Sequence, residues 1–202
     1  MNDPAASKTH RILVIDDTPD IHADFRKILC DDRSGSTLDT HEAALFGDPN
    51  TLGKQSNFQV DSAFQGEQGL ARVHHAIQEG FPYEIAFVDV RMPPGWDGIE
   101  VTPKLWIADP DLQIVICSAY SDYTWEEMFA KVGTSDRMFI LKKPFERDEI
   151  LQLAHSLTEK RRAALQNRSR LKRAYDAQLK VLEETGERFQ TQIFKLKQES
   201  GD

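Results

Sequence analysis

Five short apolar segments recur along the chain as far as residue 141, and longer amphipathic segments separate them. The apolar segments are Arg11–Ile15, Phe58–Ala63, Ile85–Val90, Leu112–Cys117 and Met138–Leu141. Their length and their β-branched residues are typical of buried parallel strands. Strands that alternate with helices predict an α/β domain with a doubly wound, five-stranded parallel sheet and right-handed crossovers.

The intervening segments carry apolar residues at intervals of three and four, which predicts helices. We expect one from Pro19 to just before Asp31, then Glu67–Glu79, Gly98–Ala108 and Thr124–Val132, and a last helix from Glu146 onward. Gly80 and Gly133 follow two of these segments and suit helix C-termini. Pro103 fits its helix only if it lies in the first turn, where no N–H is needed.

Residues 31–57 form an insertion between the first helix and the second strand, rich in Asp, Ser, Thr, Gly and Asn. Connections of this length are usually either functional or disordered. Thr40–Phe46 is predicted as a short helix within it. The apolar residues of that helix favour a partly ordered docking element.

Polar residues lie at the C-terminal ends of four predicted strands. They are Asp16, Asp17, Asp89, Ser118, and Lys142 or Lys143. Open α/β sheets bind their ligands beyond the carboxyl ends of the strands, where the strand order switches. The sequence therefore predicts one site that these side chains share.

Three carboxylates at such an edge repel one another at neutral pH. A hard divalent cation removes that cost, and oxygen ligands of this kind suit Mg²⁺. One carboxylate can then act as the nucleophile toward a phosphoryl group, while an ammonium group and a hydroxyl hold phosphoryl oxygens. The product is an acyl phosphate, a labile group suited to a reversible signal.

The sequence resembles the response-regulator receiver family of two-component systems, which has the CheY-like, flavodoxin-like fold. The motifs are Ile12-Leu-Val-Ile-Asp-Asp17, Phe87-Val-Asp-Val-Arg-Met-Pro-Pro94 with Asp97-Gly98 after it, Ser118-Ala119, and Lys143-Pro144-Phe145. The resemblance spans about Arg11 to Leu157. Within this family, the sequence is similar to receivers found ahead of GGDEF, EAL or histidine-kinase output domains.

Carried over residue by residue, the resemblance implies that Asp89 is the phosphoacceptor. Asp16 and Asp17 correspond to the acidic pair that binds Mg²⁺ with it, and Arg91 would lend its backbone carbonyl to the metal. The phosphoryl donor would be a histidine kinase or a phosphotransfer protein. The turn at 93–96 is longer than the family's common version and could reshape access to Asp89.

Ser118 matches the family's switch hydroxyl, and Lys143 matches its lysine, which precedes a proline across a cis peptide bond. The family usually has an aromatic residue three positions before its lysine. Counting back from Lys143 gives Ile140, whereas counting back from Lys142 gives Phe139. Lys143 is favoured because it precedes the proline, and Lys142 stays open as the alternative.

The chain is predicted to consist of an N-terminal tail (1–10), a receiver domain (11–157) and a helical tail (158–202). Apolar or small residues of the tail recur in steps of four and three at Tyr175, Leu179, Leu182, Gly186, Phe189, Ile193 and Leu196. Such a seam is typical of a coiled coil and favours a homodimer. A single amphipathic helix packed on its own domain is the alternative.

The net charge of −8 is unevenly distributed, because residues 1–155 carry 14 Lys and Arg against 26 Asp and Glu, and residues 156–202 carry 11 against 7. An acidic body disfavours nucleic acid as a partner. The basic residues of the tail are interpreted as a solvated helix face: Lys160, Arg161, Arg162, Arg168, Arg170, Lys172 and Arg173.

No apolar run approaches the roughly 20 residues of a membrane span, and residues 1–10 lack a secretory signal. Cys30 and Cys117 are the two cysteines, and both are expected to be small buried side chains. A reduced, cytoplasmic protein without a membrane partner is the simplest interpretation.

The main hypothesis is a phosphorylation switch in which Asp89 is modified and the tail, a dimer or another partner responds. The chain would then be a signalling domain that catalyses only its own phosphoryl transfer and dephosphorylation. Two alternatives stay open: the regulatory N-terminal part of a larger GGDEF, EAL or kinase protein, and a phosphorylation-independent scaffold. A haloacid-dehalogenase-like phosphatase is disfavoured, because that family has an Asp-x-Asp motif at its nucleophile, whereas this chain has Asp16-Asp17-Thr18 and Asp89-Val90-Arg91.

Overall fold

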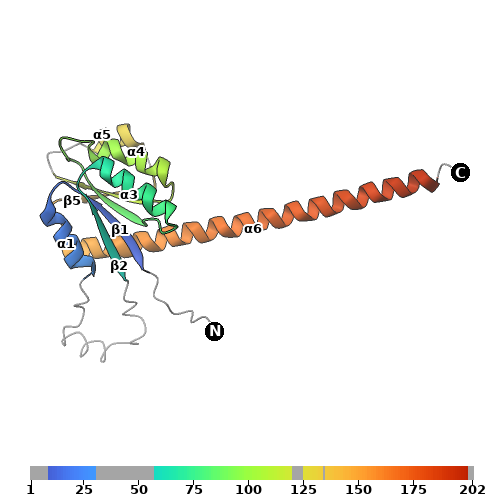
Figure 1. Ribbon diagram of the computed structural model, residues 1–202, viewed down its shortest axis with the longest axis horizontal. Helices are drawn as coiled ribbons and strands as arrows, with labels where there is room; N and C mark the ends of the chain where they lie inside the picture. The colour runs from blue at the N-terminus through green and yellow to red at the C-terminus, as the bar shows by residue number, and fades with distance from the viewer. Residues whose placement is uncertain (1–8, 31–56, 120–124, 134, 200–202) are drawn as a thin grey trace, which may run out of the picture. The chain divides into compact units, whose positions relative to one another are not determined.

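The structure, a computed structural model, describes residues 9–30, 57–119, 125–133 and 135–199. The chain divides into two compact units, residues 1–161 and 162–202. In the first unit, helices surround a central sheet (Figure 1). The short helix predicted at Thr40–Phe46 lies outside the described residues.

The first unit is built around a parallel sheet with the strand order β2-β1-β3-β4-β5. The strands are β1 (His10–Ile15), β2 (Phe58–Ala63), β3 (Ile85–Asp89), β4 (Gln113–Ser118) and β5 (Met138–Lys142). The order reverses between β1 and β3, which makes their carboxyl ends the switch point of the sheet. The predicted α/β class is confirmed, and each predicted strand boundary lies within one residue of the observed one.

The helices are α1 (Pro19–Cys30), α3 (Gly66–Gln78), α4 (Gly98–Ala108), α5 (Trp125–Val132) and α6 (Arg147–Glu199). Gly80 and Gly133 follow α3 and α5 with φ of 74° and 82°, which glycine adopts without strain. At the start of α4, the side chains of Asp97 and Glu100 each accept the other's backbone N–H. Pro103 lies in the second turn of α4, not the first, so the helix forgoes one backbone hydrogen bond there.

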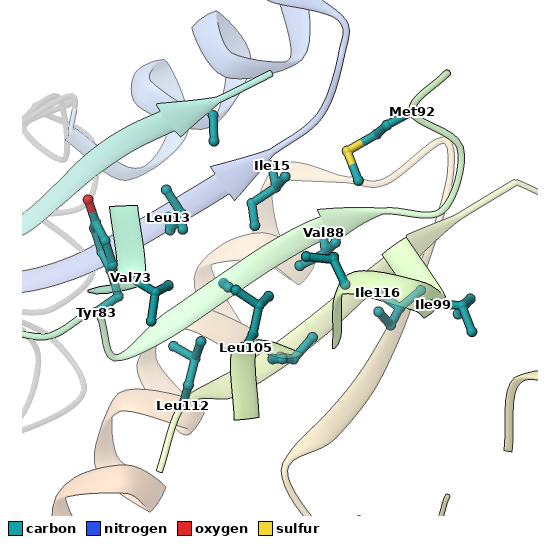
Figure 2. Close-up of a cluster of buried hydrophobic side chains, with 14 of the residues drawn as sticks. Leu13, Ile15, Val73, Tyr83, Val88, Met92, Ile99, Leu105, Leu112 and Ile116 are labelled. Carbon is teal, nitrogen blue, oxygen red and sulfur yellow. The ribbon is translucent and has the colours of Figure 1, made fainter. Parts of the chain in front are cut away.

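Apolar side chains cover both faces of the sheet. On one face, Leu13 packs in a cluster with Val73 of α3 and Leu105 of α4 (Figure 2). The same cluster includes Met128 of α5. On the other face, Ile12 packs with Phe25 of α1 and Ala154 of α6. Successive strand residues point to opposite faces, so an uninterrupted apolar run is buried on both sides. This burial holds the strand ends, and the polar residues after them, in fixed positions.

Arg161 corrects the interpretation of the basic residues as one solvated face. Its residue is 4% exposed, and its Nη2 donates to Oδ2 of Asp109 at 2.8 Å. Arg161 lies four and seven residues after Leu157 and Ala154, both buried, so helical periodicity turns it toward the core. Cys30 is also exposed rather than buried, because it ends α1, whereas Cys117 is buried as expected.

The helix α6 continues over 53 residues, which confirms the predicted long C-terminal helix. From residue 162 to residue 191 every side chain is exposed. The exposed residues include Tyr175, Leu179, Leu182 and Phe189 of the predicted seam. Among the residues that the structure describes, no helix has the length and apolar character needed to cross a membrane.

Candidate functional site

Three carboxylates meet at the switch point of the sheet. β1 and β3 pair in parallel with Ile15 opposite Val88, so Asp16 after β1 lies beside Asp89 at the end of β3. Asp16, Asp17 and Asp89 each offer a carboxylate oxygen, and these oxygens lie within 4.8 Å of one another. We call these three residues the acidic cluster.

Lys143 contacts two members of the acidic cluster. Its Nζ lies 2.8 Å from Oδ2 of Asp16 and 2.7 Å from Oδ1 of Asp89. Its backbone N–H donates to the carbonyl oxygen of Ser118, which fixes the turn after β5 beside the end of β4. Lys142 ends β5 with an exposed side chain. The peptide bond between Lys143 and the following proline is cis, as the resemblance implied.

Asp89 is buried, and both of its carboxylate oxygens are engaged. Oδ1 contacts Lys143, and Oδ2 accepts the backbone N–H of Arg91 at 3.1 Å. Burial raises the pKa of Asp89 above its ordinary value, and the charge of Asp16 adds to this, although Lys143 and Arg91 oppose it. The carboxyl group of Asp89 is thus held in its charged form only against a cost.

Lys143 responds to the same electrostatics in the opposite direction. Burial alone would lower the pKa of Lys143, but the hydrogen bonds and charges of Asp16 and Asp89 raise it well above its ordinary value. One ammonium group nevertheless faces three carboxylates. The surplus of negative charge and the all-oxygen donor set fit a hard divalent cation such as Mg²⁺.

Ser118 and Arg91 flank the acidic cluster. Ser118 is the buried last residue of β4, next to the pair that Asp89 forms with Cys117, and its hydroxyl donates to the carbonyl oxygen of Ala119 at 3.1 Å. Arg91 has an exposed side chain, and its backbone N–H is bound to Asp89. The strand ends therefore gather the predicted site residues at one edge.

Gly98 brings the start of α4 against the main chain of Asp89. A Cβ atom at Gly98 would lie 2.2 Å from the carbonyl oxygen of Asp89, so no other residue fits without a shift. The backbone N–H of Gly98 also donates to the carbonyl oxygen of Val90 at 3.0 Å. The start of α4 is therefore in direct contact with the strand end that carries Asp89.

The long turn at residues 93–96 is attached to the start of α3. Gln65 accepts the N–H of Gly95 and donates to the carbonyl oxygen of Pro93, and Glu67 accepts the N–H of Trp96. Side chains before and within α3 thus hold the turn that follows Asp89.

His22 is a residue of this region that sequence reasoning missed. It lies in the first turns of α1, is 1% exposed, and its Nε2 is 2.8 Å from the carbonyl oxygen of Asp16. A histidine six residues after the first acid was the available signal, but no metal-ligand spacing marked it.

Comparison with known proteins gives a family and a fold. The family model described as the response regulator receiver domain matches residues 36–155. Asp16 and Asp17 precede the matched range, so their place beside Asp89 follows from the pairing of β1 with β3.

Two curated relatives are longer than this chain. The C4-dicarboxylate transport transcriptional regulatory protein DctD of Rhizobium meliloti is 36% identical over 93 residues, which are 46% of this chain and 19% of that protein. A cyclic di-GMP phosphodiesterase of Thermotoga maritima is 29% identical over 140 residues, which are 69% of this chain and 34% of that protein. The chain therefore spans about a fifth to a third of these relatives.

Solved structures of low identity share the fold. A receiver protein from Sinorhizobium medicae has a TM-score of 0.51 at 22% identity, covering 76% of this chain and 98% of that one. A CheY-like receiver domain protein from Methanospirillum hungatei has a TM-score of 0.54 at 17% identity, covering 78% and 99%. These similarities support the arrangement of the sheet and its helices.

Proposed function

The chain belongs to the family of response regulator receiver domains, and from this premise we propose that it is a phosphorylation-controlled switch with Asp89 as the phosphoacceptor. The donor is the phosphohistidine of a histidine kinase or a phosphotransfer protein. The observation that carries the proposal is the contact of Lys143 Nζ with both Asp16 and Asp89 inside a cluster of three carboxylates. The domain acts in signalling and has no turnover substrate apart from its own phosphoryl group.

Phosphorylation requires a carboxylate oxygen of Asp89 to attack phosphorus. An O–P bond forms while the N–P bond of the donor breaks, and the electron pair of the broken bond leaves on the donor's imidazole. Lys143, already within 2.7 Å of Asp89, can hold a phosphoryl oxygen, and the Ser118 hydroxyl can hold another. In-line positioning and charge neutralisation carry most of the catalysis in such transfers.

Asp16, Asp17 and Asp89, with the backbone carbonyl of Arg91, would hold Mg²⁺. The bound ion supplies positive charge to the oxygens of the transferring phosphoryl group. The raised pKa of Asp89, caused first by burial and then by the charge of Asp16, supports this assignment, because a further positive charge would stabilise the ionised carboxylate.

The output proceeds, in this proposal, through α6. The exposed apolar residues Tyr175, Leu179, Leu182 and Phe189 follow heptad spacing and suit pairing with a second copy of the chain. We propose that nucleic acid is no partner, because the first 155 residues are acidic. We also propose a cytoplasmic location, in keeping with two free cysteines. Since the relatives are longer, a regulatory role ahead of a GGDEF, EAL or kinase output is the alternative.

Phosphoryl transfer is tested by incubation with acetyl phosphate and Mg²⁺, followed by intact-protein mass spectrometry. The unaltered chain should gain one phosphoryl group, and Asp89→Asn should gain none. Asp24→Asn, which changes an exposed acid on α1, should behave as the unaltered chain does. Equal phosphorylation of the Asp89→Asn chain would overturn the assignment.

The output is tested by light scattering with and without beryllofluoride, a phosphoryl mimic. A switch predicts that the mass or partner binding of the unaltered chain changes, and that Asp89→Asn does not respond. Leu182→Asn should prevent dimerisation but leave phosphorylation intact. A mass and partner binding that never respond would favour the phosphorylation-independent scaffold instead.

A further inference from the structure

We infer that His22 is a positioning residue for the acidic cluster, acting through the main chain that carries Asp16 and Asp17. The inference rests on the proposed function of that cluster. His22 Nε2 lies 2.8 Å from the carbonyl oxygen of Asp16. A carbonyl oxygen only accepts, so the hydrogen of this bond is on Nε2 and the side chain is the donor.

The burial of His22 and its unsatisfied Nδ1 argue against a role in core packing alone. Its residue is 1% exposed, and its Nδ1 has no hydrogen-bond partner within the described part of the chain. A buried polar atom without a partner costs stability, and an aliphatic side chain would fill the same space without that cost. The bond to Asp16 is the benefit that a histidine provides here and a leucine does not.

The bond completes the restraints on Asp16. Its backbone N–H donates to Ala63, its Oδ1 accepts the N–H of Thr18 at 2.9 Å, and its Oδ2 contacts Lys143. The carbonyl group held by His22 belongs to the peptide unit that joins Asp16 to Asp17. Its orientation therefore sets the direction in which the second acid leaves the first.

The imidazole itself is held from the side. Its ring lies 4.6 Å from the ring of Phe64, which follows β2, so His22 is fixed between α1 and the loop after β2. A rigid donor bound to the main chain of a ligand pair orients the pair in the way that outer-sphere partners orient metal ligands. Removing such a partner typically lowers metal affinity by about 10- to 100-fold.

The test compares His22→Met, which removes the donor, with His22→Gln, which retains a donor N–H. His74→Met, an exposed histidine on α3, is the matched control. Isothermal titration calorimetry measures the Kd for Mg²⁺, and thermal unfolding in EDTA separates loss of fold from loss of the site. We expect His22→Met to weaken Mg²⁺ binding about tenfold, with His22→Gln and His74→Met close to the unaltered chain.

Phosphorylation by acetyl phosphate gives a second readout. His22→Met should be slow at low Mg²⁺ and recover most of its rate at saturating Mg²⁺, because the nucleophile and Lys143 are unchanged. Unaltered Mg²⁺ affinity in His22→Met would overturn the inference, and so would equal weakening in His22→Gln. Failure of the unaltered chain itself to bind Mg²⁺ would overturn the proposed function instead.

Discussion

Ion pairs lie at both ends of β1, but they differ in burial and in how fully the charge of the carboxylate is compensated. At the amino end, Asp61 Oδ2 accepts a hydrogen bond from Arg11 Nη2 at 2.7 Å and another from the Tyr83 hydroxyl at 2.7 Å. Arg11 Nη2 also donates to the Tyr83 hydroxyl oxygen at 3.2 Å. The Arg11 guanidinium also lies 4.5 Å from the centre of the Tyr83 ring. Arg11 thus binds one partly buried carboxylate closely, and its Nη1 lies 3.8 Å from a second, half-exposed carboxylate, that of Glu79. At the carboxyl end, Lys143 contacts two of the three acids of the cluster.

The pKa values of the carboxylates at the two ends shift in opposite directions, and Asp89 is the more deeply buried of the two. Burial alone would raise the pKa of Asp61, but the hydrogen bonds from Arg11 and Tyr83 lower it below its ordinary value. Burial raises the pKa of Asp89, and its hydrogen bonds do not compensate. A carboxylate whose hydrogen bonds outweigh the cost of its burial therefore serves stability, whereas one whose burial is not compensated indicates a site that a further cation completes.

The largest expected effect concerns the buried ion pair of Arg161 with Asp109. Their side chains are 4% and 9% exposed, so Arg161→Met leaves a buried carboxylate without its cation. We expect a loss of about 3–5 kcal/mol in the free energy of unfolding, measured by denaturant titration. Arg170→Met, at an exposed tail position, should change it by no more than about 0.5 kcal/mol. Equal losses in the two variants would mean that the buried pair does not contribute to the free energy of unfolding.

The next effect is stabilisation by Mg²⁺ at the carboxyl end of β1, where the acidic cluster lies. A cation that binds only the folded state stabilises it, by about 2.7 kcal/mol at a free concentration of 100 times its Kd. Mg²⁺ should therefore raise the melting temperature of the unaltered chain. Asp16→Asn and Asp89→Asn should lose most of the rise, and Asp24→Asn should retain it. An undiminished rise in the two cluster variants would place the cation elsewhere.

Breaking the amino-end pair should separate stability from cation binding. Arg11→Met leaves Asp61 partly buried without its cation, since the Asp61 side chain is 21% exposed. We expect a loss of about 2 kcal/mol, less than for a fully buried pair because solvent screens Asp61. The Mg²⁺-induced stabilisation should be unchanged. A reduced response to Mg²⁺ would show that the two ends of β1 are coupled.

Much of this arrangement is predictable from sequence because parallel strands impose it. The apolar runs give the strands, and period-two alternation buries both faces, so Asp16, Asp89 and Ser118 had to emerge at one edge. Lys143 follows from the same argument applied to β5. The sequence near each strand was enough to predict the position of these residues, since each position depends only on where its own strand ends.

The remaining contacts depend on pairs that are far apart in sequence. The interpretation of Arg161 as solvated was wrong, because a basic residue on a long polar helix gives no sign of its acidic partner 52 positions earlier. The bond of His22 to a carbonyl oxygen leaves no side-chain pattern, because every residue offers that acceptor. Asp61 lies within a predicted strand, and no sequence pattern marks Arg11, 50 positions earlier, as its partner.

The smallest expected effect is on the pH dependence of stability, to which Asp61 and Asp89 contribute with opposite signs. The pKa of Asp61 is lowered on folding, so the stability it contributes is present above its unfolded pKa of about 3.9 and is lost as pH falls through the folded value. The pKa of Asp89 is raised, so the folded state binds its proton more readily than the unfolded state does. The cost of ionised Asp89 is therefore present above its folded pKa and is relieved as pH falls through it.

Without Mg²⁺ at about pH 7, Asp89→Asn should thus stabilise the chain, by less than Arg11→Met destabilises it, because the uncompensated charge is removed while Lys143 keeps its contact with Asp16. Asp61→Asn should destabilise it, because Arg11 then loses the nearer and less exposed of its two carboxylates. Denaturant titrations in EDTA at several pH values between neutral and mildly acidic measure both differences, and the gain in Asp89→Asn should shrink as the pH falls. An Asp89→Asn chain that is less stable at every pH would make Asp89 a balanced partner of Lys143, and the contrast between the two ends of β1 would not hold.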